Sequence, residues 1–121
     1  MSRAINIDNA PHYQWGGNCD GWHLVRTPDL SVIQERVPPG GQETRHSHSR
    51  ARQFFFVLSG EAVLELDGQR HVLAPQSGLD VPPGAPHQLR NESASDLWFL
   101  VISQPMAQGD RIGAELETGP A

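Results

Sequence analysis

Two histidines near the middle of this sequence of 121 residues stand at a spacing that suits the binding of a metal ion. His46 and His48 are two positions apart, and in an extended strand such residues point to the same face. Two neutral imidazoles on one face can bind a single metal ion at about 2.0–2.1 Å each. A pair of this kind is a weak signal alone, since six histidines in a chain of this length sometimes fall two apart by accident. The surrounding residues must decide whether it is a site.

Two further motifs surround the pair. Gly40 stands six positions before His46, and Gly60 stands seven positions after Gln53. The later segment PPGAPHQLRN supplies a third histidine, His87. Together these stretches resemble the two signature motifs of the cupin superfamily, in which a glycine, HxH, a glutamate and a glycine are followed by PxGxxHxxxN. The resemblance covers roughly residues 40–91 and is carried by His46, His48, Gly60, Pro82, Gly84, His87 and Asn91.

This resemblance implies an all-β fold, namely a small antiparallel jelly-roll β-barrel with a single domain. It also implies one divalent transition metal (Fe, Zn, Ni, Mn or Cu), held by His46, His48, His87 and the side chain at position 53. Imidazole binds all of these metals, so the ligands do not select one. Dimers are common in the family, and a homodimer is therefore expected. The sequence departs from the family at Gln76, where the second motif opens with glycine, and at Gln53, where the first motif has its glutamate.

Gln53 changes the charge of the expected metal centre. A divalent ion bound by three neutral imidazoles and a carboxylate has a net charge of +1, whereas with glutamine the centre keeps +2. Anionic ligands should then bind more strongly. An amide oxygen is a weaker ligand than a carboxylate for a hard cation and cannot accept a proton as a base. Lewis-acid chemistry on a carbonyl compound and oxygen chemistry on iron both remain open.

The elements that must position these residues are short strands. Twelve glycines and ten prolines interrupt the chain and leave no long helical stretch. Asp67-Gly68 predicts a type I′ turn between two antiparallel strands. We expect residues 1–28 to pack on the barrel, 29–104 to form it, and 105–121 to be a polar tail with a short helical turn around 114–117. The strands are predicted at 21–25, 30–37, 53–58, 62–66, 71–73, 78–81, 87–91 and 97–103.

Strand alternation also predicts a ligand pocket. If Gln53 points inward, Phe55 does too. The apolar run LWFLVIS has two possible registers, and we favour Leu100 and Ile102 as the inward pair. The strand at 30–37 turns either Gln34 and Arg36 or Glu35 toward the cavity. An inward Arg36 would pair with an anionic ligand, whereas arginine is more commonly found at the surface.

Composition limits the partners. A net charge of −5 argues against nucleic acid and anionic membranes as partners, and a small-molecule ligand, anionic in view of the +2 centre, is expected instead. The chain has no apolar run that suits a signal peptide or a membrane span, which predicts a soluble cytoplasmic protein. Two functions fit these features. One is an enzyme that catalyses isomerisation, elimination or dioxygenation, and the other is a sensor or carrier whose metal is structural or absent.

Overall fold

The computed structural model describes residues 2–114, which form strands and contain no helix. Each strand is short because glycine, proline or polar residues end it, as the composition predicts. The strands, in chain order, are β1 (His12–Trp15), β2 (Cys19–Thr27), β3 (Leu30–Val37), β4 (His46–His48), β5 (Arg52–Ser59), β6 (Ala62–Leu66), β7 (Gln69–Leu73), β8 (Gly78–Val81), β9 (His87–Arg90), β10 (Leu97–Gln104) and β11 (Arg111–Gly113).

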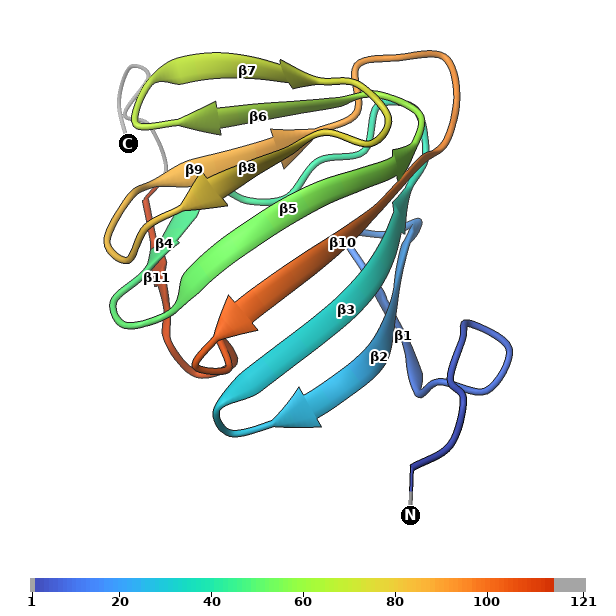
Figure 1. The fold of residues 1–121 in the computed structure, drawn as a ribbon. Helices are drawn as coiled ribbons and strands as arrows, with labels where there is room; N and C mark the ends of the chain where they lie inside the picture. Colours follow the sequence, from blue (N-terminus) through green and yellow to red (C-terminus); the bar gives the residue numbers. More distant parts are fainter. Residues whose placement is uncertain (1, 115–121) are drawn as a thin grey trace.

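Two antiparallel sheets face each other (Figure 1). One has six strands in the order β1-β2-β3-β10-β5-β8, and the other has five in the order β11-β4-β9-β6-β7. Several neighbours come from distant parts of the sequence, as in β3-β10-β5, whereas β1-β2-β3 and β6-β7 are consecutive. The predicted all-β jelly-roll fold is confirmed.

Local turn chemistry sets the register at two positions. Asp67 and Gly68 both have positive φ angles, 51° and 86°, as the predicted type I′ turn requires, and Leu66 pairs with Gln69 across it. Gln76 also has a positive φ angle, 66°. This left-handed conformation explains why the family motif opens with glycine there, since glycine adopts it without steric cost. Here glutamine adopts it within a turn that the Ser77 amide closes by donating to the carbonyl of Ala74, while the Gln76 amide donates to the carbonyl of Val57 in β5.

The hydrophobic core lies between the sheets. Its largest fully buried side chains include Phe99 and Leu97 of β10, Leu64 of β6 and Leu89 of β9. Burying a side chain of this size contributes about 1.5–3 kcal/mol relative to leaving it exposed. The core thus joins β10 of one sheet to β6 and β9 of the other, and it fixes the distance across which the functional side chains face each other.

The register of β10 corrects one prediction. Leu100 and Ile102 lie on the outer face of the six-stranded sheet, while Phe99, Val101 and Ser103 point inward and are buried. The reason is the pairing with β5, in which Ser103 stands opposite the inward-facing Gln53. The apolar run alone could not reveal this, because both faces of the strand carry large apolar side chains.

Segments near both ends of the described residues belong to the sheets. β1 and β2 extend the six-stranded sheet beyond β3, and β11 pairs with β4. The segment expected to be a polar tail therefore contains a strand. Its three residues are exposed, so the hydrophobic pattern carried no signal for it. Apart from Ala114, the helical turn predicted at 114–117 lies outside the described residues. Within residues 2–114, no helix is long and apolar enough to cross a membrane.

Candidate metal centre

Three buried histidines from two adjacent strands come together between the sheets. β4 carries His46 and His48 on one face, and β9 places His87 directly opposite His46. The ring centroids of His46 and His87 are 4.4 Å apart. One ring nitrogen from each histidine can be chosen such that all three lie within 4.8 Å of one another. Because each metal–nitrogen bond is about 2.0–2.1 Å long, two nitrogens on one ion lie at most about 4.2 Å apart, and a small inward shift of the rings would place all three on a single ion.

Backbone carbonyls orient two of the rings. Nδ1 of His46 donates to the carbonyl of Thr44 at 2.7 Å, and Nδ1 of His87 to that of Ala85 at 3.0 Å. A neutral imidazole that donates through Nδ1 keeps a lone pair on Nε2, which is the usual arrangement of a metal-binding histidine. Nδ1 of His48 is buried and has no hydrogen-bond partner among the described residues. This ring therefore also has an uncommitted nitrogen, and the three side chains fit a metal ion.

The protonation states also suit a metal. Burial lowers the pKa of His46 to about 3 and shifts the pKa values of His48 and His87 downward as well. Loss of solvation disfavours the charged ring, and the neighbouring rings repel a positive charge further. All three histidines are consequently neutral near pH 7, so no proton has to leave before a metal binds.

The loops on both sides of the cluster are held by hydrogen bonds. The amide of Gly84, in the tight turn before β9, donates to the carbonyl of His48 at 2.7 Å. After β4, the Asp110 carboxylate accepts hydrogen bonds from the Ser49 hydroxyl and from the amides of Arg50 and Ala51. The turn that delivers His87 is thus tied to β4, and the segment before β11 is tied to the loop after His48.

Gln53 of β5 faces the histidines from the opposite sheet. Its Nε2 donates to the Ser103 hydroxyl at 3.0 Å, and its Oε1 lies 3.1 Å from Nε2 of His87. The hydrogen bond to Ser103 thus turns the amide oxygen toward the cluster. The four residues predicted to hold a metal lie together.

A cavity of about 620 Å³ opens beside the cluster. Phe55 lines it, as predicted, but Leu100, Ile102 and Arg36 do not. Arg36 is on the outer face, where its guanidinium donates to Oδ2 of Asp20 at 2.6 Å. The hypothesis that Arg36 binds a ligand is therefore wrong, because this ion pair and the strand alternation hold it outside. The inward residue of this stretch is Glu35, the alternative that the sequence left open.

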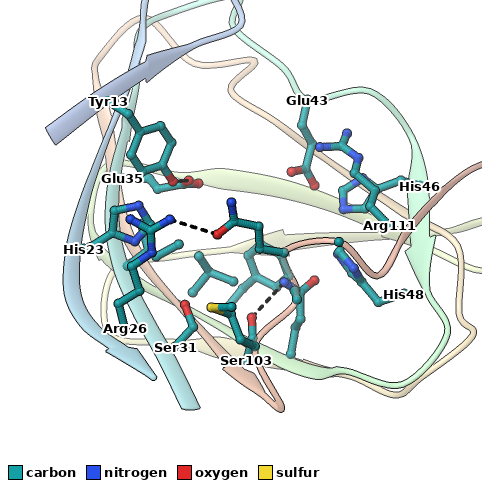
Figure 2. A pocket seen from close by; sticks show the side chains of 18 of the residues that line it. Tyr13, His23, Arg26, Ser31, Glu35, Glu43, His46, His48, Ser103 and Arg111 are labelled. Carbon is teal, nitrogen blue, oxygen red and sulfur yellow. Dashed lines mark hydrogen bonds between the residues drawn. The ribbon is translucent and has the colours of Figure 1, made fainter. Parts of the chain in front are cut away.

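Two carboxyl groups line this cavity, although the first motif lacks its glutamate (Figure 2). Burial raises the pKa of Glu35 to about 7, and burial together with the charge on Glu35 raises the pKa of Glu43 to about 8. Strand alternation offered Glu35 as one of two choices. Glu43 precedes β4 in a loop, and no periodicity marked it. The cavity thus contains groups that can exchange protons near neutral pH.

Other pocket residues come from the chain ends. Tyr13 of β1, His23 of β2 and Arg111 of β11 all line the cavity. In Figure 2, Tyr13, Glu35 and His23 lie on one side of it, with Glu43, Arg111 and His46 on another. The sequence did not reveal this set, because residues 1–28 were expected only to pack on the barrel and residues 105–121 to form a polar tail. Arg111 adds a positive charge beside the two carboxyl groups, and its Nη2 donates to the carbonyl of Thr44 at 3.0 Å.

Two facing antiparallel sheets with histidines from one and a glutamine from the other define a double-stranded β-helix protein with a candidate metal centre. The sequence matches the model of the Cupin domain over residues 33–103, and the chain belongs to the cupin family.

Known relatives show how widely this fold is used. The chain is 28% identical over 98 residues to a mannose-1-phosphate guanylyltransferase of Klebsiella pneumoniae. The aligned residues make up 81% of this chain and 20% of that protein. The chain thus spans about a fifth of that relative's length. It is 29% identical over 92 residues to the H2HPP isomerase of Bacillus subtilis, covering 75% of this chain and 38% of that protein. The structure of the polyketide cyclase RemF from Streptomyces resistomycificus superposes with a TM-score of 0.81 at 18% identity, over 97% of this chain and 88% of that one.

Proposed function

We propose that this protein is a metal-dependent cupin enzyme that moves a proton within a small, anionic, oxygenated molecule. The metal would be one divalent transition ion, Fe, Zn, Ni, Mn or Cu, held by His46, His48 and His87 with the amide oxygen of Gln53 beside it. The observation that carries the proposal is the shared cavity. Two imidazoles of the cluster, His46 and His48, line the same space as two carboxyl groups with pKa values of about 7 and 8, and His87 packs against His46.

The chemistry follows from these groups. When bound, a divalent metal polarises the carbonyl oxygen of a chelated substrate and so acidifies the neighbouring C–H bonds. Arg111 supplies a positive charge for a substrate carboxylate, and Phe55 and Val101 supply apolar walls. A carboxyl group whose pKa lies near 7 can both accept and return a proton at neutral pH. This combination favours isomerisation or elimination over oxygen chemistry. One relative, the protein of Bacillus subtilis, is named an isomerase.

The test is a set of reactions with protein loaded separately with each metal. Small hydroxy acids, oxo acids and enols are incubated in D₂O, and ¹H NMR follows deuterium incorporation while an electrode follows oxygen. Deuterium incorporation or isomerisation without oxygen uptake is the expected result. Oxygen consumption would instead select a dioxygenase. Saturable binding without any reaction would select a sensor or carrier and contradict the proposal.

Gln53→Glu should tighten metal binding roughly tenfold and weaken the binding of an anion such as oxalate. The added carboxylate lowers the net charge of the loaded centre from +2 to +1. Glutamate has nearly the same shape, and it can accept a hydrogen bond from the Ser103 hydroxyl. Chelator competition measures the metal affinity, and titration calorimetry measures oxalate binding. Gln69→Glu, an exposed change in β7 with the same change in charge, is the control and should alter neither. Weaker metal binding or tighter oxalate binding in Gln53→Glu would refute the charge argument.

We further propose that a second copy of the chain covers the outer face of the six-stranded sheet. An apolar row crosses four strands there, through Val25, Val32, Ile102 and Phe54, and Phe54 stacks on Phe56. Val25 and Phe54 are each 38% exposed in the single chain. Apolar rows of this extent on a sheet usually mark an interface. A homodimer would therefore bury the side chains that the β10 register leaves outside.

Phe54→Lys should convert this dimer to a monomer, because a charge at the centre of an apolar interface must lose its hydration. Sedimentation velocity gives the mass of each variant. Val72→Lys, which places the same charge on an exposed apolar position of the other sheet, should remain dimeric. A monomeric wild type, or a dimeric Phe54→Lys protein, would rule out this interface.

A further inference from the structure

Three residues form a straight row across the first three strands of the six-stranded sheet. Tyr13 of β1 stands opposite Gly21 of β2, and Gly21 stands opposite Glu35 of β3. Adjacent strands are about 4.8 Å apart, so Tyr13 and Glu35 are separated by two such spacings. Even so, the Tyr13 hydroxyl donates to Oε2 of Glu35 at 2.8 Å. The tyrosine side chain thus reaches across an entire strand.

Gly21 makes this reach possible. A Cβ atom at this position would lie 2.2 Å from Cζ and 2.5 Å from Oη of Tyr13, closer than any real contact. The tyrosine ring therefore occupies the space that any other residue at position 21 would need. Gly21 has an ordinary strand conformation without a positive φ angle, so the close approach of the ring is what requires glycine here.

This arrangement orients the carboxyl group of Glu35, because the Tyr13 hydroxyl donates to it. Glu35 faces the cavity of about 620 Å³, and among the described residues its only side-chain hydrogen-bond partner is Tyr13. The other pocket carboxyl, Glu43, uses Oε1 to accept the amide of Leu89 and so fastens the loop before β4 to β9. Removing a carboxyl group from water costs free energy. Carboxyl groups that are nevertheless kept partly buried on a cavity wall are common at functional sites.

The charged and titratable groups around Glu35 come from several elements. The strands β5 and β10 contribute uncharged side chains to the cavity, among them Gln53, Phe55 and Val101. The hydroxyl of Tyr13 stays protonated as a donor, because burial and the charge on Glu35 raise its pKa well above the usual range. The remaining groups are Cys19, His23 and Arg26 of β2, Glu43 before β4, Arg111 of β11, and the three histidines of β4 and β9.

We propose that Glu35 is the catalytic base of this site and that Tyr13 is the residue that positions it. This inference rests on the proposed function and names the group that performs it. The Glu35 carboxylate takes a proton from a carbon next to the substrate's carbonyl group. The electrons of that C–H bond form a carbon–carbon double bond, and the carbonyl oxygen becomes negative. The carboxylic acid of Glu35 then returns the proton to the same or a conjugated carbon, and no oxidant is consumed.

The probe for this step is pyruvate, whose methyl protons exchange for deuterium when the neighbouring carbonyl is polarised. Exchange in D₂O is followed by ¹H NMR with zinc- or manganese-loaded protein. Glu35→Gln should slow exchange at least about 100-fold at unchanged metal content, since general acid–base catalysis contributes about 10²–10⁴-fold. Glu61→Gln, an exposed change outside the cavity, is the matched control and should exchange at the wild-type rate.

A second readout does not depend on activity. In metal-loaded protein with ¹³C-labelled glutamate carboxyls, the Glu35 signal is the one absent from Glu35→Gln. Its midpoint should move to higher pH in Tyr13→Phe, because the lost hydrogen bond favoured the carboxylate. The pH at which exchange reaches half its maximum should rise with it. Gly21→Val, which displaces the ring, should have the same effect, and circular dichroism checks that each variant is folded.

The outcomes separate the two proposals. Wild-type exchange that persists in Glu35→Gln, or that disappears in Glu43→Gln alone, would overturn the assignment of Glu35 and leave the proposed function intact. A Glu35 midpoint that does not move in Tyr13→Phe would overturn the positioning role of Tyr13. If the metal-loaded wild type neither exchanges a proton of any hydroxy acid, oxo acid or enol in the set nor isomerises one, both the proposed function and the assignment of Glu35 fall.

Discussion

His87→Ala is expected to lower the affinity of this protein for a divalent metal by more than about 100-fold. Loss of a residue that merely supports a ligand costs about 10- to 100-fold, and loss of a ligand should cost more. His87 is the member of the cluster that comes from β9, opposite His46. Its removal leaves two histidines of a single strand, with Gln53 facing an empty space. Elemental analysis after gel filtration, followed by chelator competition, would measure the change.

His71→Ala is the control for this experiment. His71 lies on β7, away from the cluster, so its loss should leave about one divalent ion per chain, as in the wild type. His46→Ala provides a second test if His87→Ala fails to fold. Equal metal content in wild type and both cluster variants would show that the three histidines do not hold the ion.

Phe99→Ala should reduce the free energy of unfolding by about 3–5 kcal/mol. Phe99 is 1% exposed and lies in the core between the two sheets. Its ring packs 6.0 Å from that of Phe55, which in turn meets the edge of His87 at 5.7 Å. Truncation leaves a cavity behind the metal centre, and the surrounding side chains can fill it only in part. Urea denaturation followed by tryptophan fluorescence would give the difference.

Leu100→Ala is the matched change on the next residue of the same strand. Because Leu100 lies on the outer face, its truncation should cost only about 1 kcal/mol. The comparison therefore tests the register of β10 directly. If Leu100→Ala proved as destabilising as Phe99→Ala in the monomeric Phe54→Lys background, the inner and outer faces would have been assigned the wrong way round.

Much of the fold could be predicted because its signals are local. Asp67-Gly68 specified a turn, and the strands at 30–37, 62–66 and 78–81 have the predicted bounds. The histidines could be located because two motifs fixed their spacing. The register of β10 could not be predicted, since it depends on the pairing of Ser103 with Gln53 rather than on hydrophobicity.

The carboxyl groups of the site show the same limit. Glu35 was one of two choices on its strand, and the outward ion pair of Arg36 with Asp20 decides between them. Asp20 comes from β2, and no local pattern predicts that partnership. Tyr13 and Arg111 come from strands with exposed or half-exposed residues, where the hydrophobic pattern is weak. The missing motif glutamate suggested a site without a base, whereas the tertiary structure supplies carboxyl groups from elsewhere.

The most direct test of the central claim is the anomalous scattering of a crystal grown from metal-loaded protein. Data collected on both sides of the metal's absorption edge would locate the ion without assumptions about its ligands. We expect one strong peak per chain, about 2.0–2.2 Å from a ring nitrogen of each of His46, His48 and His87 and facing the cavity that Glu35 lines. A peak elsewhere, or no peak from protein that elemental analysis shows to be loaded, would contradict this expectation.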